Sequence, residues 1–281
     1  MGDTVGGSTL GADTRSDTIS RTFVETPSGQ IHVRETGPRD GDAVPLLCLH
    51  QSPASSLTFA PILPHLAQGK RRVLALDTPG FGESFRPAHK PGIVDYTQWI
   101  ADVPDTLGLP RVDLLGYFTG AAIAAELALL YPDLVRRVVM VGPPWFSEEQ
   151  RQKARENAWP GRPRPDGGHL MKEWDRVMTR YPDTLPLDIK ADLFQEFFRG
   201  GANAIWGEEA VAEYDLSQRL GGVTQPVLVM QPDAFHGDGE AAHRALPDSR
   251  YLRLEGVPPL GLFHLNTMEI ATAVTAFLDQ P

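Results

Sequence analysis

Phe118 lies between two glycines, at the point where an apolar run gives way to a helical pattern. The run from Val112 to Tyr117 is apolar enough for a buried strand, and a helical pattern begins directly after Phe118, so the chain must turn sharply there. Gly116 and Gly120 bracket Phe118 with the G-x-S-x-G spacing of a strained turn in which neighbouring Cβ atoms would clash. A phenyl ring has no lone pair to attack a carbonyl carbon. The pattern therefore predicts a strained turn that cannot support ordinary serine hydrolysis.

Apolar runs alternating with helical segments surround this turn. Runs rich in Val, Leu and Ile predict strands at 22–25, 31–35, 44–49, 72–77, 112–117, 137–141, 226–231 and 249–254. An amphipathic helix is expected at 267–279. Buried strands alternating with helices indicate an α/β fold with a mostly parallel, doubly wound sheet that is covered on both faces.

The chain is expected to form one core with one inserted cap. The core comprises residues 21–145 and 221–281, and residues 1–20, rich in Gly, Ser, Thr and Asp, are interpreted as a disordered tail. Residues 146–220 are polar and aromatic and are expected to form a helical cap. Its predicted helices lie at 147–157, 171–180, 187–199 and 208–214.

From about Thr22 onward, the sequence resembles the α/β-hydrolase fold superfamily, as a divergent member. The run His50-Gln51-Ser52-Pro53 resembles the HG-x-P loop of that superfamily, with Gln51 in place of glycine. The run Thr78-Pro-Gly-Phe-Gly-Glu-Ser84 is similar to its D-x-P-G-F-G-x-S motif, and the turn at Phe118 occupies the place of its nucleophile elbow. Together these motifs imply an α/β-hydrolase fold with a cap.

The resemblance also locates the other two members of a catalytic triad. Its sequence frames place Phe235 at the acid position and Leu260 at the histidine position, so all three triad positions, with Phe118, are apolar. Asp233 is either a displaced acid or part of an Asx-type turn. His264 either reaches the pocket through a shifted loop or lies on the surface. Because losing a triad member lowers rates by about 10⁴ to 10⁶, triad hydrolysis is not expected.

An oxyanion hole built from backbone groups can persist without a triad. The resemblance implies that its donors are the Thr119 N–H and an N–H from Gln51 or Ser52, with the Gln51 side-chain amide as an additional donor. Such donors at a helix start would hydrogen-bond a carbonyl or enolate oxygen. His50 belongs to the same loop, where it either braces the loop or contacts the substrate.

Aromatic residues predict an apolar pocket under the cap. Besides Phe118 and its neighbour Tyr117, the predicted substrate contacts include cap or cap-edge aromatics, namely Trp145, Trp174 and Phe198; Trp159 and Trp206 fall in the same segment. His169 follows a Gly-Gly turn. It is either an acid or base that reaches the substrate or a solvated residue at a helix start.

Bulk properties narrow the range of partners. A net charge of −10 argues against a nucleic-acid partner, and no apolar run approaches the roughly 18 residues that a membrane span needs. Cys48, the only cysteine, is expected to be a buried apolar residue, and a lone cysteine favours a cytoplasmic location. The eight histidines lack metal-ligand spacing, and Gly80-Phe-Gly82 does not open a phosphate-binding helix. We therefore predict no metal and no cofactor.

The leading hypothesis is a non-hydrolytic enzyme on this scaffold. An apolar chamber with an oxyanion hole suits cofactor-free cyclisation, C–C bond formation or isomerisation of an apolar, polyketide-like small molecule. One alternative is a rewired hydrolase in which Asp233, His169 or His264 activates water. Another is a non-catalytic binder of small molecules. The sequence leaves the substrate and the oligomeric state open.

Overall fold

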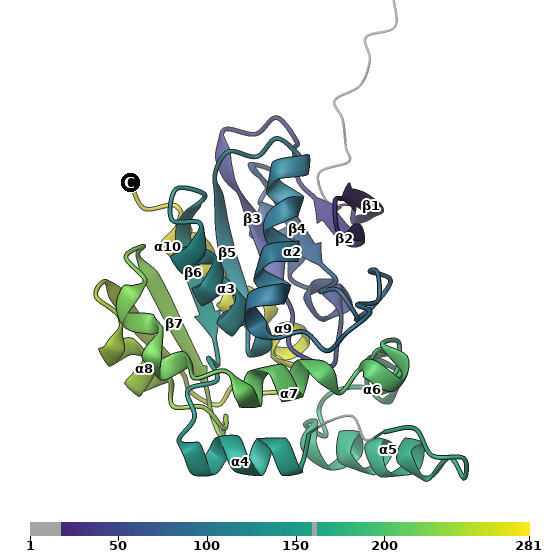
Figure 1. The fold of residues 1–281 in the computed structure, drawn as a ribbon. Coiled ribbons are helices and arrows are strands. Elements are labelled where there is room, and N and C mark those ends of the chain that lie inside the picture. Colours follow the sequence, from purple (N-terminus) through teal and green to yellow (C-terminus); the bar gives the residue numbers. More distant parts are fainter. Residues whose placement is uncertain (1–17, 159–161) are drawn as a thin grey trace, which may run out of the picture.

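An eight-stranded sheet forms the centre of the computed structural model, which describes residues 18–158 and 162–281 (Figure 1). Its strand order is β1-β2-β4-β3-β5-β6-β7-β8. Strands β3 to β8 are parallel, whereas β1 and β2 form an antiparallel hairpin and β2 pairs antiparallel with β4. The strands are β1 (Ser20–Thr26), β2 (Gly29–Thr36), β3 (Ala43–Leu49), β4 (Arg71–Leu76), β5 (Val112–Tyr117), β6 (Val135–Val141), β7 (Val227–Pro232) and β8 (Ser249–Leu254).

The predicted fold class is confirmed, and each strand expected from the sequence is present within about two residues of its predicted bounds. Strand β8 has the predicted bounds, and β6 begins two residues early at Val135. Strand β1 begins at Ser20, inside the segment interpreted as a tail, because its hairpin pairing continues to Glu35 of β2. The remainder of that tail, residues 1–17, lies outside the described residues.

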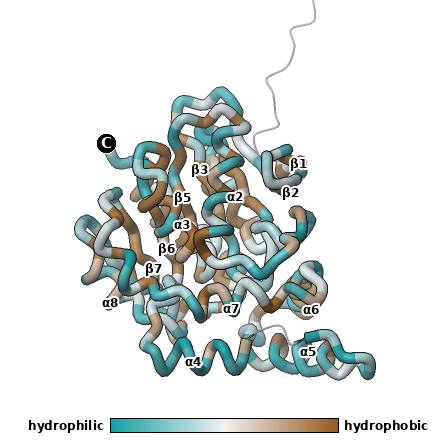
Figure 2. Tube along the Cα trace, in the orientation of Figure 1, coloured by the Kyte–Doolittle hydropathy of each residue, from teal (hydrophilic) through white to brown (hydrophobic). Residues whose placement is uncertain are grey.

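Helices cover both faces of the sheet. Along β3, Leu47 and Leu49 face one apolar cluster while Leu46 and Cys48 face the other, as the two-residue period of a strand requires. The first cluster includes residues of α2 (Ile93–Thr106), α3 (Thr119–Leu130) and α8 (Gly239–Ala245). The second includes residues of α1 (Leu63–Ala67), α9 (Leu262–Leu265) and α10 (Thr267–Leu278). In Figure 2 the strands and α3 are the most hydrophobic parts of the trace.

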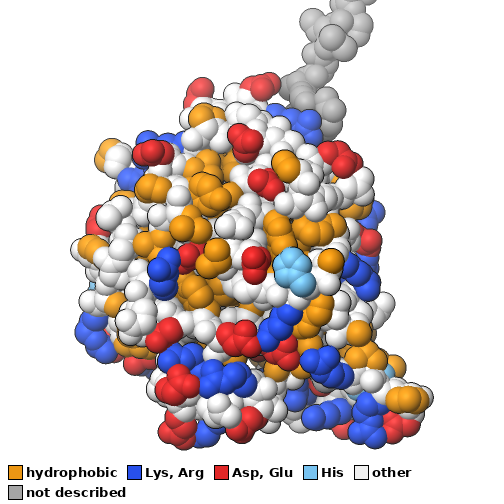
Figure 3. Space-filling view, viewed as in Figure 1, with side chains coloured by type: hydrophobic (Ala, Val, Ile, Leu, Met, Phe, Trp, Pro, Cys, Tyr) orange, Lys and Arg blue, Asp and Glu red, His pale blue; other side chains and the backbone are white. Residues whose placement is uncertain are grey.

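Four helices between β6 and β7 form the cap at the bottom of Figure 1. They are α4 (Glu148–Glu156), α5 (Gly168–Arg180), α6 (Leu187–Glu196) and α7 (Trp206–Glu213). Val177, Tyr181 and Phe197 form a small buried cluster that packs on Ala54 and Leu260 of the core. Helix α4 buries none of its residues, and charged side chains line this lower edge of the molecule (Figure 3). Trp159 lies outside the described residues.

Over residues 18–158 and 162–281, every helix is too short or too polar to cross a bilayer. The longest helix, α2, has 14 residues, whereas a span needs about 20 apolar ones.

Candidate active site

The turn at Phe118 has the strained backbone that the two glycines predict. Phe118 has φ 49° and ψ −104°, a conformation that residues with a side chain rarely adopt. A Cβ on Gly116 would overlap the Gly120 carbonyl oxygen, and a Cβ on Gly120 would overlap the Leu49 carbonyl oxygen. Both positions therefore require glycine, and the elbow between β5 and α3 is geometrically intact.

The three residues that the resemblance places at triad positions meet at one cavity of about 370 Å³. Phe118, Phe235 and Leu260 all line it, although they come from different connections of the sheet. The rings of Phe118 and Phe235 lie 5.6 Å apart in an edge-on arrangement. Tyr117 also lines the cavity, and its hydroxyl donates a hydrogen bond to the Pro259 carbonyl oxygen. Apolar side chains therefore form the floor of this cavity, at the positions where the resemblance predicts a triad.

The loop after β3 is held by His50. The His50 Nε2 accepts a hydrogen bond from Thr78 N at 3.0 Å, so its Nδ1 carries the proton and donates to the Gln51 carbonyl oxygen at 2.8 Å. Complete burial lowers the pKa of His50 and keeps it neutral. His50 does not line the cavity; it braces two loops at the carboxyl ends of neighbouring strands.

One of the expected oxyanion donors is already engaged. The Ser52 N–H donates to Thr119 Oγ1 at 3.1 Å. This bond ties the loop to the start of α3, and it uses the N–H that the resemblance assigned to a substrate oxygen. The Thr119 N–H belongs to the first turn of α3, where backbone N–H groups have no acceptor within the helix. The expected donors that remain are the Thr119 N–H, the Gln51 backbone N–H and the side-chain amide of Gln51.

Two buried polar atoms at the cavity have no partner in the described part of the chain. They are Gln51 Oε1 and Ser52 Oγ, and both residues line the cavity. Buried polar groups in folded proteins normally find a hydrogen-bond partner, so each such atom requires an explanation. Here a ligand in the cavity would supply the missing partner.

The three polar residues suggested as acid or base lie elsewhere. His169 Nδ1 accepts a hydrogen bond from Arg164 N at 3.1 Å near the surface of the cap. Asp233 accepts from Gly256 N at 2.7 Å and forms an ion pair with Arg253 at 3.2 Å. His264 lines a separate void of about 10 Å³ behind Gln51. None of the three lines the main cavity.

The cap presents different aromatic residues to the cavity from those expected. Trp174 packs on Phe194 with ring centres 5.3 Å apart, and Phe194 in turn packs on Phe198. Trp145 packs against the core cluster. Because these side chains fill the cap and its edge, Tyr181 and Phe197 line the cavity in their place.

Sequence reasoning missed the polar residues that do line the cavity, Arg180, Glu208 and His236. Burial raises the pKa of Glu208 to about 8, although Arg180 and Arg176 oppose that shift. Burial also lowers the pKa of His236, and nearby Arg180 lowers it further. The sequence contains no local signal for these residues, because Gly207 falls just before the predicted helix at 208–214 and not inside it.

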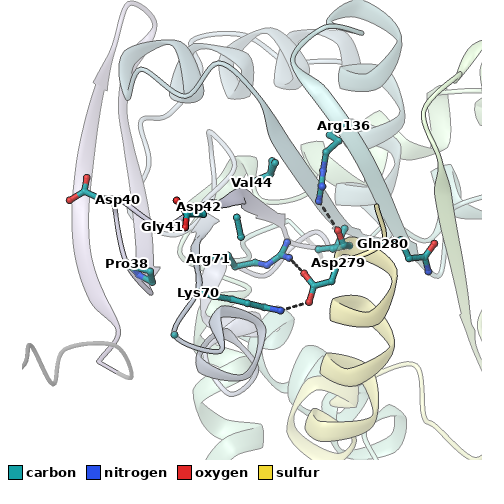
Figure 4. Close-up of a pocket in the computed structure, with 13 residues that line it drawn as sticks. Pro38, Asp40, Gly41, Asp42, Val44, Lys70, Arg71, Arg136, Asp279 and Gln280 are labelled. Atoms are coloured by element: carbon teal, nitrogen blue, oxygen red, sulfur yellow. Dashed lines mark hydrogen bonds and ion pairs between the residues drawn. The ribbon is translucent and has the colours of Figure 1, made fainter.

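A second, open groove of about 750 Å³ lies at the other end of the sheet, where β3 and β4 begin (Figure 4). Its charges are largely paired within the protein. Lys70 and Arg71 both bind Asp279 (Figure 4). Arg136 binds Asp113 at 2.6 Å. The carboxyl ends of parallel strands are the usual location for ligands in such sheets. The cavity at Phe118 therefore remains the candidate site.

Comparison with known proteins agrees with this architecture. Residues 44–170 match the family model described as alpha/beta hydrolase fold. An enol-lactonase from Burkholderia xenovorans superimposes with a TM-score of 0.75 at 20% identity, covering 92% of this chain and all of that one. The chain therefore has the α/β-hydrolase fold.

Curated relatives are named as hydrolases. A haloalkane dehalogenase from Psychrobacter cryohalolentis is 35% identical over 114 residues, which is 39% of this chain and 36% of that protein. A 2-(acetamidomethylene)succinate hydrolase from Mesorhizobium japonicum is 28% identical over 241 residues, covering 80% of this chain and 82% of that protein. The first three of the curated relatives are each matched over only 36% to 41% of their own length.

Proposed function

We propose that this protein is a non-hydrolytic enzyme that cyclises, isomerises or forms a C–C bond within an apolar, polyketide-like small molecule. The observation that supports it is the convergence of Phe118, Phe235 and Leu260 on one cavity. A nucleophile, an acid and a histidine would be needed at these positions for triad hydrolysis, and all three are apolar. As proposed, the reaction uses no cofactor, involves neither nucleic acid nor membrane, and takes place in the cytoplasm.

The geometry supports catalysis by positioning and by carbonyl polarisation. A cavity of about 370 Å³ lies within the usual size range of small-molecule sites. Its aromatic walls would fold a flexible substrate so that the reacting atoms approach, which alone can lower a barrier by about 7–11 kcal/mol. The Thr119 N–H and the Gln51 amide would hydrogen-bond one activated carbonyl as negative charge develops on its oxygen.

Two other functions use the same cavity. The names of the relatives favour hydrolysis, but a rewired hydrolase that used Asp233, His169 or His264 would need one of them at the cavity, and none lines it. A non-catalytic binder would need only the cavity itself. The enzyme and binder functions differ in whether a bound compound leaves unchanged.

The test is incubation of the purified protein in H₂¹⁸O with extracts containing apolar polyketide-type metabolites, followed by mass spectrometry. The expected product has the mass of its substrate, an altered retention time and no ¹⁸O, and it is absent with heat-denatured protein. A product that gains water and carries ¹⁸O would establish hydrolysis instead. A compound that is retained but recovered unchanged would establish a binder.

The Gln51→Leu variant tests the role of the Gln51 amide in this incubation, and Gln152→Leu is its matched control. It removes an amide donor at the cavity while nearly keeping side-chain volume, so product formation should fall by about 10²-fold or more, as for loss of a single oxyanion-hole donor. The exposed Gln152 lies on α4 outside the cavity, and Gln152→Leu should leave product formation unchanged.

A further inference from the structure

The cavity has a polar end that is separate from its aromatic floor. Arg180 ends α5, Glu208 lies in the first turn of α7, and His236 follows β7, so three distant segments meet there. Within the described residues, the side chains of these three form no hydrogen bond and no ion pair. Arg180 and His236 are exposed and Glu208 is half-buried, so this end forms a polar rim of the cavity that suits a ligand with a polar group of its own.

The polar end carries net positive charge near neutral pH. Glu208 is mainly protonated at pH 7 because its pKa is raised to about 8. His236 is neutral because its pKa lies below the usual value of 6.5. Arg180 keeps its charge, and the nearby Arg176 is balanced by its ion pair with Glu173 at 3.0 Å. The uncompensated charge of this end is therefore the guanidinium of Arg180.

We propose that the polar end binds a carboxylate or enolate head group of an otherwise apolar substrate, with Arg180 as its cation and Glu208 as a hydrogen-bond donor. The aromatic floor at Phe118 then holds the apolar body. The neighbour of Glu208, Gly207, contacts Ser52 Oγ, so the head group lies beside the loop that carries Gln51 and Ser52. The head-group assignment specifies the substrate class of the proposed function. It depends on that function only because both use the same cavity.

The assignment predicts a particular pH dependence. As the pH rises through about 8, Glu208 loses its proton, and its carboxylate then repels the bound anion. The charged groups that face Glu208 are Arg176 and Arg180, both of which remain protonated in this range, and His236 is neutral throughout it. Affinity for an anion should therefore fall between pH 7 and pH 9, and affinity for a neutral molecule should not.

Two fluorescent probes with the same rings test the proposal on the full-length protein. They are 1-anilinonaphthalene-8-sulfonate, which is an anion, and N-phenyl-1-naphthylamine, which lacks the sulfonate. In Arg180→Met, the Kd of the anionic probe should rise about tenfold or more, as expected for a hydrogen bond to a charged group. The Kd of the neutral probe should change less than about twofold, and Arg180→Lys should restore part of the loss.

Three further variants complete the design. Glu208→Gln should keep the anionic probe bound at pH 7 and abolish the weakening between pH 7 and pH 9. Leu260→Trp should weaken both probes, because it fills the cavity that they occupy. Arg164→Met, which alters an exposed arginine of the cap, should change neither Kd.

The proposal is overturned if Arg180→Met weakens both probes equally, or if Glu208→Gln leaves the pH dependence intact. Circular dichroism of each variant distinguishes these outcomes from unfolding, and Glu208→Gln decides the matter if Arg180→Met does not fold. Both probes measure binding without turnover. A negative result with the probes therefore leaves the ¹⁸O experiment valid. A hydrolytic result in the ¹⁸O experiment does not contradict the head-group assignment.

Discussion

Gly207 of the cap helix α7 lies directly against Ser52 of the loop after β3. A Cβ built on this glycine would overlap Ser52 Oγ and would lie 2.7 Å from the Phe81 ring. The absence of a side chain thus lets α7 approach the loop closely and places the next residue, Glu208, at the cavity. This contact is one of those that hold the cap close to the core at the site.

Gly207→Ala should move α7 away from the loop and open the cavity. Inserting a methyl group into such a tight contact costs about 1–3 kcal/mol, so the Kd of N-phenyl-1-naphthylamine should rise severalfold. Titration of the probe's fluorescence measures the change. Gly221→Ala is the control, because the nearest atom to its Cβ would be 3.9 Å away, and its Kd should equal that of the wild type.

Phe118→Ser should not create an esterase. The new hydroxyl would lie in the elbow, but Phe235 and Leu260 supply neither an acid nor a histidine to take its proton. Release of p-nitrophenol from p-nitrophenyl acetate should stay within about tenfold of the rate without protein, since neither Phe235 nor Leu260 can act as a general base.

The triple change Phe118→Ser, Phe235→Asp and Leu260→His should exceed that single variant. It places a nucleophile, an acid and a histidine at three positions that already line one cavity. A general base positioned near the hydroxyl contributes about 10²- to 10⁴-fold, so even an imperfect triad should be detectable in the same assay. If the single variant is as active as the triple one, another residue acts as base and the triad assignment is wrong.

Gly120→Ala should destabilise the fold through the elbow. Its Cβ would overlap the Leu49 carbonyl oxygen, which is backbone and cannot rotate away, so the free energy of unfolding should fall by about 1–3 kcal/mol. Urea unfolding followed by circular dichroism measures this change. An unaltered midpoint in Gly120→Ala would show that β3 and α3 are not in close contact.

The stability of the fold should decrease as the pH falls below about 6.5. Burial lowers the folded-state pKa of His50, so the unfolded chain binds more protons than the folded chain in this range. Protonation of Nε2 would also break the bond from Thr78 N. The free energy of unfolding, from urea titrations at pH 7.5 and pH 5.5, should therefore fall with pH.

The His50→Gln variant isolates the contribution of this histidine. A glutamine can accept the Thr78 N–H without titrating, so the decrease between pH 7.5 and pH 5.5 should be smaller than in the wild type. His65→Gln, at an exposed position of α1, should leave the decrease unchanged. An equal pH dependence in His50→Gln and wild type would contradict the assignment.

The sequence was sufficient to predict the core but not the cap side of the site. Apolar runs in the sequence predict the strands. The spacing of Gly116 and Gly120 identified the elbow, because local steric contacts determine that turn. Which face of a cap helix turns toward the core depends on docking instead. Nothing in the sequence distinguishes Arg180 and Glu208 from other charged cap residues, and Trp174 was predicted to contact the substrate although it packs within the cap.

His169 is a single side chain whose direction, toward the cavity or toward solvent, could not be predicted from the sequence. Its position after two glycines fitted a residue reaching toward substrate as well as a helix start at the surface. The structure ties its ring to the backbone N–H of Arg164, and Asp166 accepts a hydrogen bond from Gly168 N at 2.9 Å to begin α5. Local capping geometry thus occupies the side chain, and no sequence pattern distinguishes the two arrangements.

Because Cys48 is buried, thiol-reactive labels can be directed to cysteines introduced elsewhere in the protein. Cys48 is the only cysteine in the chain; it is fully buried in β3, and burial raises the pKa of its thiol well above the usual value. A maleimide or a thiol-reactive spin label should therefore not react with Cys48 in the native protein. One cysteine introduced on α7 and another at the elbow would then be the only reactive thiols, and the distance between their labels would report cap movement directly.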